Sequence, residues 1–325
     1  MGIFKLGPAS KFFRNAGTIV KPFQPQVTRD QLNVMSYNMG FDVGPVQNTL
    51  GETKSESEYL HSLDEIVRIV EESETDILLL QEVDLNSRRS LNMNQLSYLQ
   101  ERLKWPHAAC STTWKCFVPF DKIGKVDECA AILSRYPICK HQARIYKFNP
   151  LHTNRLLNLM LYLFFVWRSP VQYVQIEFQD RKLNIFNLHL DVFSRRNREL
   201  QIENLIQWIK ESGLDEHLLF GGDLNYHAEL GRERREEFRD FHPDNEKLPP
   251  FFQDVWKALP GLQEAFIRES TPQEQIHQNV TFPELGKRHD FVFFSSDFEH
   301  VSSEVIQTIS SSDHLPVLVK LTLQN

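Results

Sequence analysis

The residues most able to do chemistry in this chain stand at the ends of short apolar runs. The clearest example is Gly-Gly-Asp-Leu-Asn at 221–225, which follows the apolar residues 218–220. In an extended strand, side chains two positions apart point the same way, so Asp223 and Asn225 would be presented together at the edge of a sheet. Because Gly, Asp and Asn also form turns, this stretch taken alone fits an ordinary turn equally well.

Polar residues close other apolar runs in the same way. The full set is Asn38, Glu82, His189, Asp223, Asn225, Asp290, Asp313 and His314. Carboxylate and amide oxygens suit a hard divalent cation such as Mg²⁺, and imidazole can hold phosphate oxygens or move a proton from water. Each residue alone could be a helix cap or a satisfied core group. Their recurrence favours a site for phosphate-ester chemistry.

The elements that must position these residues alternate between strand and helix patterns. Strand-like runs cover 33–39, 76–82, 130–137, 174–178, 183–190, 218–223, 288–294 and 317–323, whereas helical spacing of apolar residues begins near 58 and covers 94–104 and 197–210. The run 77–80 is continuously apolar, which is typical of a strand covered on both faces. The alternation predicts an α/β domain.

Composition agrees with one globular domain. The chain has 325 residues, 41% hydrophobic and 24% charged, with no linker-like stretch or internal repeat. The net charge of −7 argues against a broad basic surface for nucleic acid, but it does not exclude a nuclease that uses a metal ion. The four cysteines at 110, 116, 129 and 139 lack CxxC or zinc spacing, which predicts free thiols in a cytoplasmic protein.

Two segments could touch a membrane. Residues 1–29 carry lysine, arginine and phenylalanine but no acidic side chain, which fits either a basic membrane-binding arm or an ordinary surface tail. The very apolar run 156–167 is shorter than the ~20 residues of a membrane span, so it is either a core element or an exposed apolar lip. We see no secretory signal or transmembrane helix, and we expect a monomer.

Seven short motifs follow one another in a recognisable order. They are Ser-Tyr-Asn at 36–38, Leu-Gln-Glu at 80–82, Ala-Ile-Leu-Ser-Arg-Tyr-Pro-Ile at 131–138, Asn-Leu-His at 187–189, Gly-Asp-Leu-Asn at 222–225, Asp-Phe-Val at 290–292 and Ser-Asp-His-Leu-Pro at 312–316. This series resembles the endonuclease/exonuclease/phosphatase superfamily, in spacing closest to uncharacterised bacterial members. The resemblance implies a DNase I-like four-layer sandwich of two packed mixed β-sheets flanked by helices, over residues 30–325.

The resemblance also implies roles for the site residues. Glu82, Asn38 and Asp313 would hold or surround Mg²⁺, with Mn²⁺ as a possible substitute, and His189 would donate to a phosphate oxygen. Asp223 would position or deprotonate the attacking water, with Asn225 beside it. Asp290 would orient His314, and sequence leaves open whether Asp223 or His314 is the base. Arg88 and Arg89 are candidates for substrate contact, and a solvated surface loop fits this stretch equally well. Arg198, one turn from Gln201, is a further candidate for substrate contact, but its position fits structural support better than catalysis.

Family membership implies the reaction but leaves the substrate open. We favour phosphodiester cleavage of the nuclease type by metal-assisted attack of water. One alternative is a lipid-directed phosphodiesterase or phosphatase, resembling sphingomyelinases or phosphoinositide phosphatases, acting at a membrane surface. The other is a non-catalytic binding module on the same fold, although such a module has no reason to keep Glu82, Asp223, Asn225, Asp313 and His314 together.

Overall fold

Two mixed sheets form the centre of the molecule. The computed structural model describes residues 19–20, 30–42, 54–118, 124–145, 170–192, 195–225, 251–267 and 279–324. The first sheet has the order β1 (Ile19–Val20), β4 (His107–Val118), β5 (Gly124–Ser134), β3 (Ile77–Asp84), β2 (Gln31–Asn38), β13 (Val317–Leu323) and β12 (Phe298–Val305). The second has the order β10 (Gln263–Glu264), β11 (Asp290–Phe294), β9 (Leu218–Asp223), β8 (Arg181–His189), β7 (Pro170–Phe178) and β6 (Ile138–Ile145).

Each sheet contains one parallel strand pair at its centre. These pairs are β2 with β3 and β8 with β9, and the other described pairings are antiparallel. Parallel neighbours need a crossover connection. Here the crossovers contain α1 (Glu56–Glu72) and α4 (Arg195–Ser212). The carboxyl ends of all four central strands therefore lie at one rim of the sandwich.

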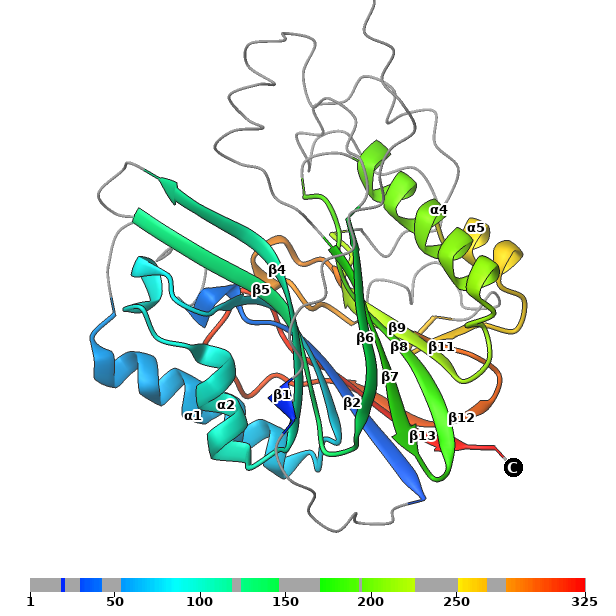
Figure 1. Ribbon diagram of the computed structural model, residues 1–325, viewed down its shortest axis with the longest axis horizontal. Coiled ribbons are helices and arrows are strands. Elements are labelled where there is room, and N and C mark those ends of the chain that lie inside the picture. The colour runs from blue at the N-terminus through cyan, green and yellow to red at the C-terminus, as the bar shows by residue number, and fades with distance from the viewer. Residues whose placement is uncertain are drawn as a thin grey trace, which may run out of the picture.

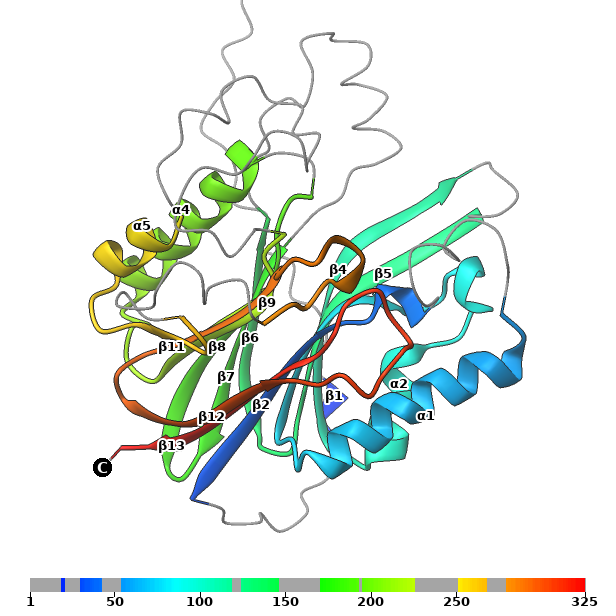
Figure 2. The same cartoon turned by 180° about the vertical axis from the view of Figure 1, so that it is seen from behind.

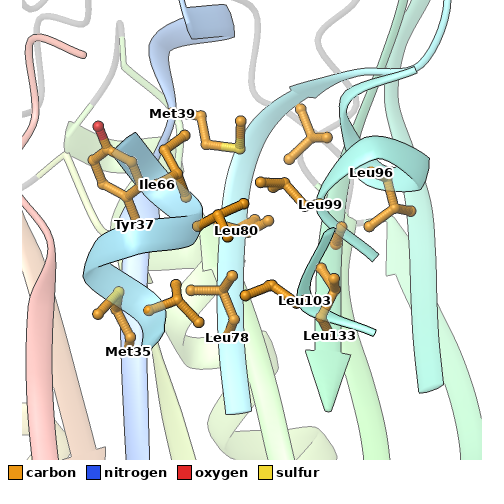
Figure 3. Close-up of a cluster of buried hydrophobic side chains, with 14 of the residues drawn as sticks. Met35, Tyr37, Met39, Ile66, Leu78, Leu80, Leu96, Leu99, Leu103 and Leu133 are labelled. Atoms are coloured by element: carbon orange, nitrogen blue, oxygen red, sulfur yellow. The ribbon is translucent and has the colours of Figure 1, made fainter. Parts of the chain in front are cut away.

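Helices cover the outer face of each sheet. Figures 1 and 2 show α1 and α2 (Gln95–Leu103) against the first sheet, and α4 and α5 (Phe251–Ala258) against the second. Figure 3 shows Met35, Tyr37 and Leu80 of the first sheet meeting Ile66 of α1 and Leu99 of α2. Helix α1 begins with a capping box between Ser55 and Glu58, which satisfies amides at its first turn.

Side-chain alternation along the strands builds the inner core and then the rim. In β2, Met35 and Tyr37 face the helices, whereas Leu32 and Val34 pack against the second sheet. With a period of two, Ser36 and Asn38 continue this inner row toward the rim. The inner row of β8 likewise runs from Leu183 and Ile185 to Asn187 and His189. The apolar core therefore gives way to polar side chains at one rim.

The four-layer sandwich expected from the resemblance is confirmed. The predicted apolar stripe of α2, Leu96, Leu99 and Leu103, is buried, and the four cysteines are free thiols. Strands β4, β6 and β12 and helix α5 were not predicted. The middle of β4 is Ser-Thr-Thr, and β6 and β12 are edge strands with mostly exposed or half-buried side chains, so these three strands lack the apolar alternation that signals a strand.

The predicted membrane-contact segments lie largely outside the described residues. This holds for 156–167 and for the arm 1–29 except β1, whose Ile19 and Val20 pair with Ala108 and His107 of β4. Within the part of the chain that the structure describes, no helix is long and apolar enough to cross a membrane.

Candidate active site

Asn38 and Asp223 join the two sheets at the rim. Asn38 ends β2 and Asp223 ends β9, and both are buried. The Asn38 Nδ2 donates to Asp223 Oδ2 at 2.9 Å and to Glu82 Oε1 at 3.1 Å. Its Oδ1 accepts the backbone N–H of Gly40 at 3.0 Å. Asn38 therefore presents its nitrogen to the two carboxylates and holds them in place, rather than offering its oxygen to a cation.

Glu82 reaches the site through a break in the strand ladder. The pairing of β3 with β5 shifts register between Leu80 and Val83, and Glu82 has a φ of 55°. A side chain with a Cβ rarely adopts this left-handed conformation, and a bulge of this kind re-aims a side chain beside a functional site. Sequence placed Glu82 at a strand end, but the structure presents it from a bulge within β3.

His189 stands between the two carboxylates. Its Nε2 lies 3.5 Å from Glu82 Oε1 and 3.6 Å from Asp223 Oδ2, and its side chain is buried. Ligand atoms of Glu82, His189 and Asp223 lie within 4.8 Å of one another. The residues come from β3, β8 and β9, and hence from both sheets. This cluster combines two carboxylates and one imidazole.

His314 and Asp290 form the other half of the site. The predicted contact is present, with His314 Nδ1 at 2.8 Å from Asp290 Oδ2, and His314 Nε2 lies 3.7 Å from Asp223 Oδ2. The ring of Phe282 packs edge-on against His314 at 4.9 Å between centroids and stacks on His289 at 5.0 Å. One carboxylate, Asp223, therefore belongs to both halves of the site.

Thr281 ties together the two chain segments that carry His314 and Asp290. Its Oγ1 accepts from the backbone N–H of His289 at 2.9 Å and of Asp290 at 3.1 Å. Its carbonyl accepts from the N–H of Leu315 at 2.7 Å. Thr281 and Phe282 lie in a loop without periodicity and were not predicted to belong to the site, and His289 was predicted only as part of the strand-like run 288–294. The histidine next to Asp290 was the one available signal.

Burial and neighbouring charges shift the pKa values of the ionisable groups at the site. Burial raises the pKa of Glu82 to about 7, with His189 opposing the shift and Glu128 and Asp313 adding to it. Burial by itself would lower the pKa of His314, but the carboxylates of Asp290 and Asp223 raise it to about 10. His314 is therefore a cation at neutral pH in this arrangement, whereas Glu82 gains and loses its proton near neutral pH.

The donor set fits a divalent cation. Carboxyl groups outnumber imidazoles at the rim, and Asp290 Oδ1 is buried without a hydrogen-bond partner in the described part of the chain. Buried carboxylates that lack enough positive partners are costly, and a bound cation offsets that cost. Glu82 and Asp223 offer the oxygen ligands that Mg²⁺ and Mn²⁺ prefer.

The remaining predicted site residues lie around this centre. Asn225 donates its backbone N–H to Asp223 Oδ1 at 2.7 Å and its Nδ2 to Leu190 O at 3.1 Å, so it fixes the Asp223 carboxylate. Asp313 accepts from Ser312 Oγ at 3.2 Å, and burial raises its pKa. Asp313 stands outside both clusters of candidate metal ligands among the described residues.

The three candidate substrate arginines differ in exposure. Arg88 is exposed. Arg89 donates to Asp84 and Glu128 at 2.9 Å, and its guanidinium carbon lies 3.2 Å from the centroid of the Phe41 ring. Arg198 is buried and donates to the carbonyl of Asp191 at 3.1 Å. Arg89 and Arg198 thus already hold the protein's own acceptors, and Arg88 is the arginine of this set that is open to solvent.

Carboxylates and imidazoles that meet at the rim of a two-sheet sandwich suit the metal-assisted hydrolysis of phosphate esters. A model of the endonuclease/exonuclease/phosphatase family matches residues 35–314, and the chain belongs to this family. The chain is accordingly a metal-dependent hydrolase acting on phosphate ester bonds. A search of curated proteins found no match.

Solved structures share the fold at low sequence identity. An endonuclease/exonuclease/phosphatase protein from Beutenbergia cavernae is 17% identical, with a TM-score of 0.59, over 91% of this chain and 72% of that chain. The human Nocturnin catalytic domain is 16% identical, with a TM-score of 0.59, over 95% and 98%. TDP2 from Caenorhabditis elegans is 15% identical, with a TM-score of 0.54, over 90% and 75%.

Proposed function

We propose that this protein is a Mg²⁺-dependent phosphodiesterase that hydrolyses its substrate by metal-assisted attack of water. One observation carries the proposal: side chains from both sheets converge at one rim, with imidazole Nε2 to carboxylate distances of 3.5 to 3.7 Å among Glu82, His189, Asp223 and His314. Glu82 would hold the cation, which when bound would neutralise phosphate charge and lower the pKa of a water molecule.

Asp223 is the residue best placed to accept the proton of the attacking water. Its Oδ1 accepts from the Asn225 amide, and its Oδ2 accepts from Asn38, so the carboxylate is held in one orientation. His314 bonds to Asp290 through Nδ1 and directs Nε2 toward Asp223, which suits a donor to a phosphoryl oxygen. His189 suits a second donor from β8. This assignment favours Asp223 over His314 as the base.

The cation content of the site favours a diester over a monoester. Among the described residues, no lysine or arginine forms an ion pair with Glu82, Asp223 or Asp290, whose ion-pair partners are His189 and His314. A phosphomonoester carries up to two negative charges, whereas a phosphodiester carries one. Two imidazoles and a divalent cation fit the single charge better.

The test compares the chromogenic diester bis(4-nitrophenyl) phosphate with 4-nitrophenyl phosphate, each with Mg²⁺, Mn²⁺ or EDTA. We expect faster turnover of the diester and loss of turnover in EDTA. Asp223→Asn should lower kcat by about 10² to 10⁴-fold at an unchanged fold. Asp215→Asn, at an exposed position away from the site, is the matched control and should keep activity.

Each outcome decides one part of the proposal. Faster turnover of the monoester would indicate a phosphatase instead of a phosphodiesterase. Full activity in EDTA would contradict the need for a metal ion, and near-normal activity of Asp223→Asn would contradict the assignment of the active site. A panel of plasmid DNA, abasic oligonucleotide, RNA, phosphoinositides and sphingomyelin then separates the nuclease-like reading from the lipid-directed alternative. The lipid-directed alternative depends on membrane contact by segments 1–29 and 156–167, and this contact stays a prediction.

A further inference from the structure

The bulge that presents Glu82 is contacted by a side chain from the opposite sheet. Glu82 adopts a φ of 55° just after the point where the regular pairing of β3 with β5 stops. The last regular pair before that point is Leu80 with Ala131. Since an L-residue with a Cβ disfavours this conformation, the surrounding structure has to hold it.

Asn187 of β8 makes contacts that suit this task. It is fully buried, and its Nδ2 reaches Leu80 O at 2.9 Å and Ala131 O at 3.1 Å. Its Oδ1 accepts from Gln81 Nε2 at 2.7 Å. One side chain from the second sheet therefore bonds both strands of the first sheet at their last regular pair, and also bonds the residue next to Glu82.

The remaining contact of Asn187 extends this polar layer away from the site. Its Nδ2 also lies 3.2 Å from Gln172 Oε1, and Gln172 Nε2 donates to Ala109 O at 3.1 Å. These groups lie in the buried layer between the sheets, where an unmade hydrogen bond is costly. Asn187 lies two residues before His189 on the same face of β8, so one strand supports the bulge and supplies an imidazole to the site.

We propose that Asn187 is a positioning residue that holds the Gln81–Glu82 bulge and thereby keeps the Glu82 carboxylate at the cation site. The statement about the cation rests on the proposed function. The statement about the bulge does not, because it follows from the hydrogen bonds alone. Asn187 acts through Glu82 and does not itself contact the substrate.

The first measurement is Mn²⁺ binding by calorimetric titration of the full chain. Asn187→Leu keeps the branching and the number of side-chain heavy atoms but has no polar atoms, and we expect it to weaken Mn²⁺ binding by about tenfold or more, which is typical for a residue that orients a metal ligand. Asn184→Leu is the matched control on the same strand. Asn184 is also a buried asparagine that bonds a backbone carbonyl, that of Glu216 at 2.9 Å, and it should leave Mn²⁺ binding unchanged.

The second measurement needs no metal. Hydrogen exchange of the backbone amides of 82–85 in EDTA should speed up at least tenfold in Asn187→Leu relative to Asn184→Leu, with both variants compared at equal global stability in urea. If Asn187→Leu does not fold, Asn187→Ala replaces it, because the space left can admit a water molecule that bonds the two carbonyls.

The two measurements separate the proposals. Wild-type protein that binds no Mn²⁺ would contradict the proposed function and leave exchange to decide the role of Asn187. If Asn187→Leu binds Mn²⁺ as tightly as wild type, or if the amides of 82–85 exchange equally fast in the two variants, the proposed role of Asn187 is overturned. Weaker binding together with faster exchange only in the Asn187 variant would support it.

Discussion

Glu82 illustrates at the scale of one residue how this site trades stability for chemistry. Its side chain is 17% exposed, its backbone is in the left-handed region, and its pKa is raised to about 7, first by burial. Each of these features costs free energy in the folded state.

Removing the Glu82 charge should stabilise the metal-free protein. The folded-state pKa lies above the ordinary value of 4.5, so folding favours the protonated form, and stability is lost as pH rises from about 4.5 through 7. At pH 8 in EDTA, Glu82→Gln should unfold with a free energy higher than wild type by on the order of 1–3 kcal/mol. Urea unfolding across pH 4 to 8 measures this.

The pH dependence provides the internal control for that experiment. The difference between Glu82→Gln and wild type should shrink toward zero near pH 4, where both folded and unfolded Glu82 are protonated. Mg²⁺ should raise the Tm of wild type but not of the variant. A variant less stable than wild type at pH 8 would show that Glu82 supports the fold.

At the scale of elements, the strand end at β9 depends on a glycine. Gly222 has a φ of +139°, and an added Cβ would stand 1.9 Å from the carbonyl oxygen of Leu188 on β8. That oxygen belongs to the backbone and cannot move without breaking the pairing of His189 with Asp223. The close approach of β8 and β9 is what puts His189 beside Asp223.

We expect Gly222→Ala to destabilise the protein by more than about 3 kcal/mol, because backbone strain adds to a steric clash. Gly213→Ala is the control, since Gly213 has a φ of +59° but open space around its Cβ position, and it should cost about 1–2 kcal/mol. Chemical denaturation of both variants measures the difference. Equal losses would mean that strands β8 and β9 can separate at no cost.

The loop before β11 is the other element on which the site depends. The Thr281 hydroxyl holds the start of β11, and the Thr281 carbonyl holds Leu315 beside His314. Thr281→Val keeps the shape and the carbonyl but loses the hydroxyl acceptor. It should lower kcat about tenfold with little change in KM, because His314 and Asp290 would drift out of alignment.

Thr281→Ser keeps the hydroxyl and should retain kcat within a few-fold of wild type. The pH profile of kcat should shift in Thr281→Val and not in Thr281→Ser. Loss of stability in Thr281→Val with an unaltered kcat per folded molecule would assign Thr281 a purely structural role.

At the scale of the whole molecule, the short strand β1, which is the described part of residues 1–29, pairs with the first sheet at the end of β4 away from the site. Ile19 and Val20 pair with the first residues of β4, whereas Glu128, which contacts Arg89 and raises the pKa of Glu82, pairs with Trp114 further along the same strand. We propose on this basis that residues 30–325 form the catalytic domain.

Deleting residues 1–29 should therefore spare catalysis. We expect kcat/KM for bis(4-nitrophenyl) phosphate within about twofold of the full chain and a Tm lower by a few degrees, because one short edge strand is lost. A large loss of activity in a folded, truncated protein would place part of the arm at the site. Unfolding would show that β1 belongs to the domain.

The sequence alone determined which chemical groups stand at the rim, because the order of apolar and polar residues along each strand encodes their positions. A polar residue after an apolar run marks where an inner row of side chains leaves the core, and this placed Asn38, His189 and Asp223 together. Period-based predictions failed where polar residues interrupt a strand, as Ser-Thr-Thr does in the middle of β4.

Only the tertiary structure decided orientation and partners. It aimed Glu82 through a bulge, turned the Asn38 nitrogen toward the carboxylates, and gave Arg89 two acidic partners instead of solvent. These outcomes depend on hydrogen bonds between segments tens to hundreds of positions apart, and such bonds form only when the two sheets pack. Sequence periodicity reports which face a side chain takes, but distance and charge at the site follow from which strands meet.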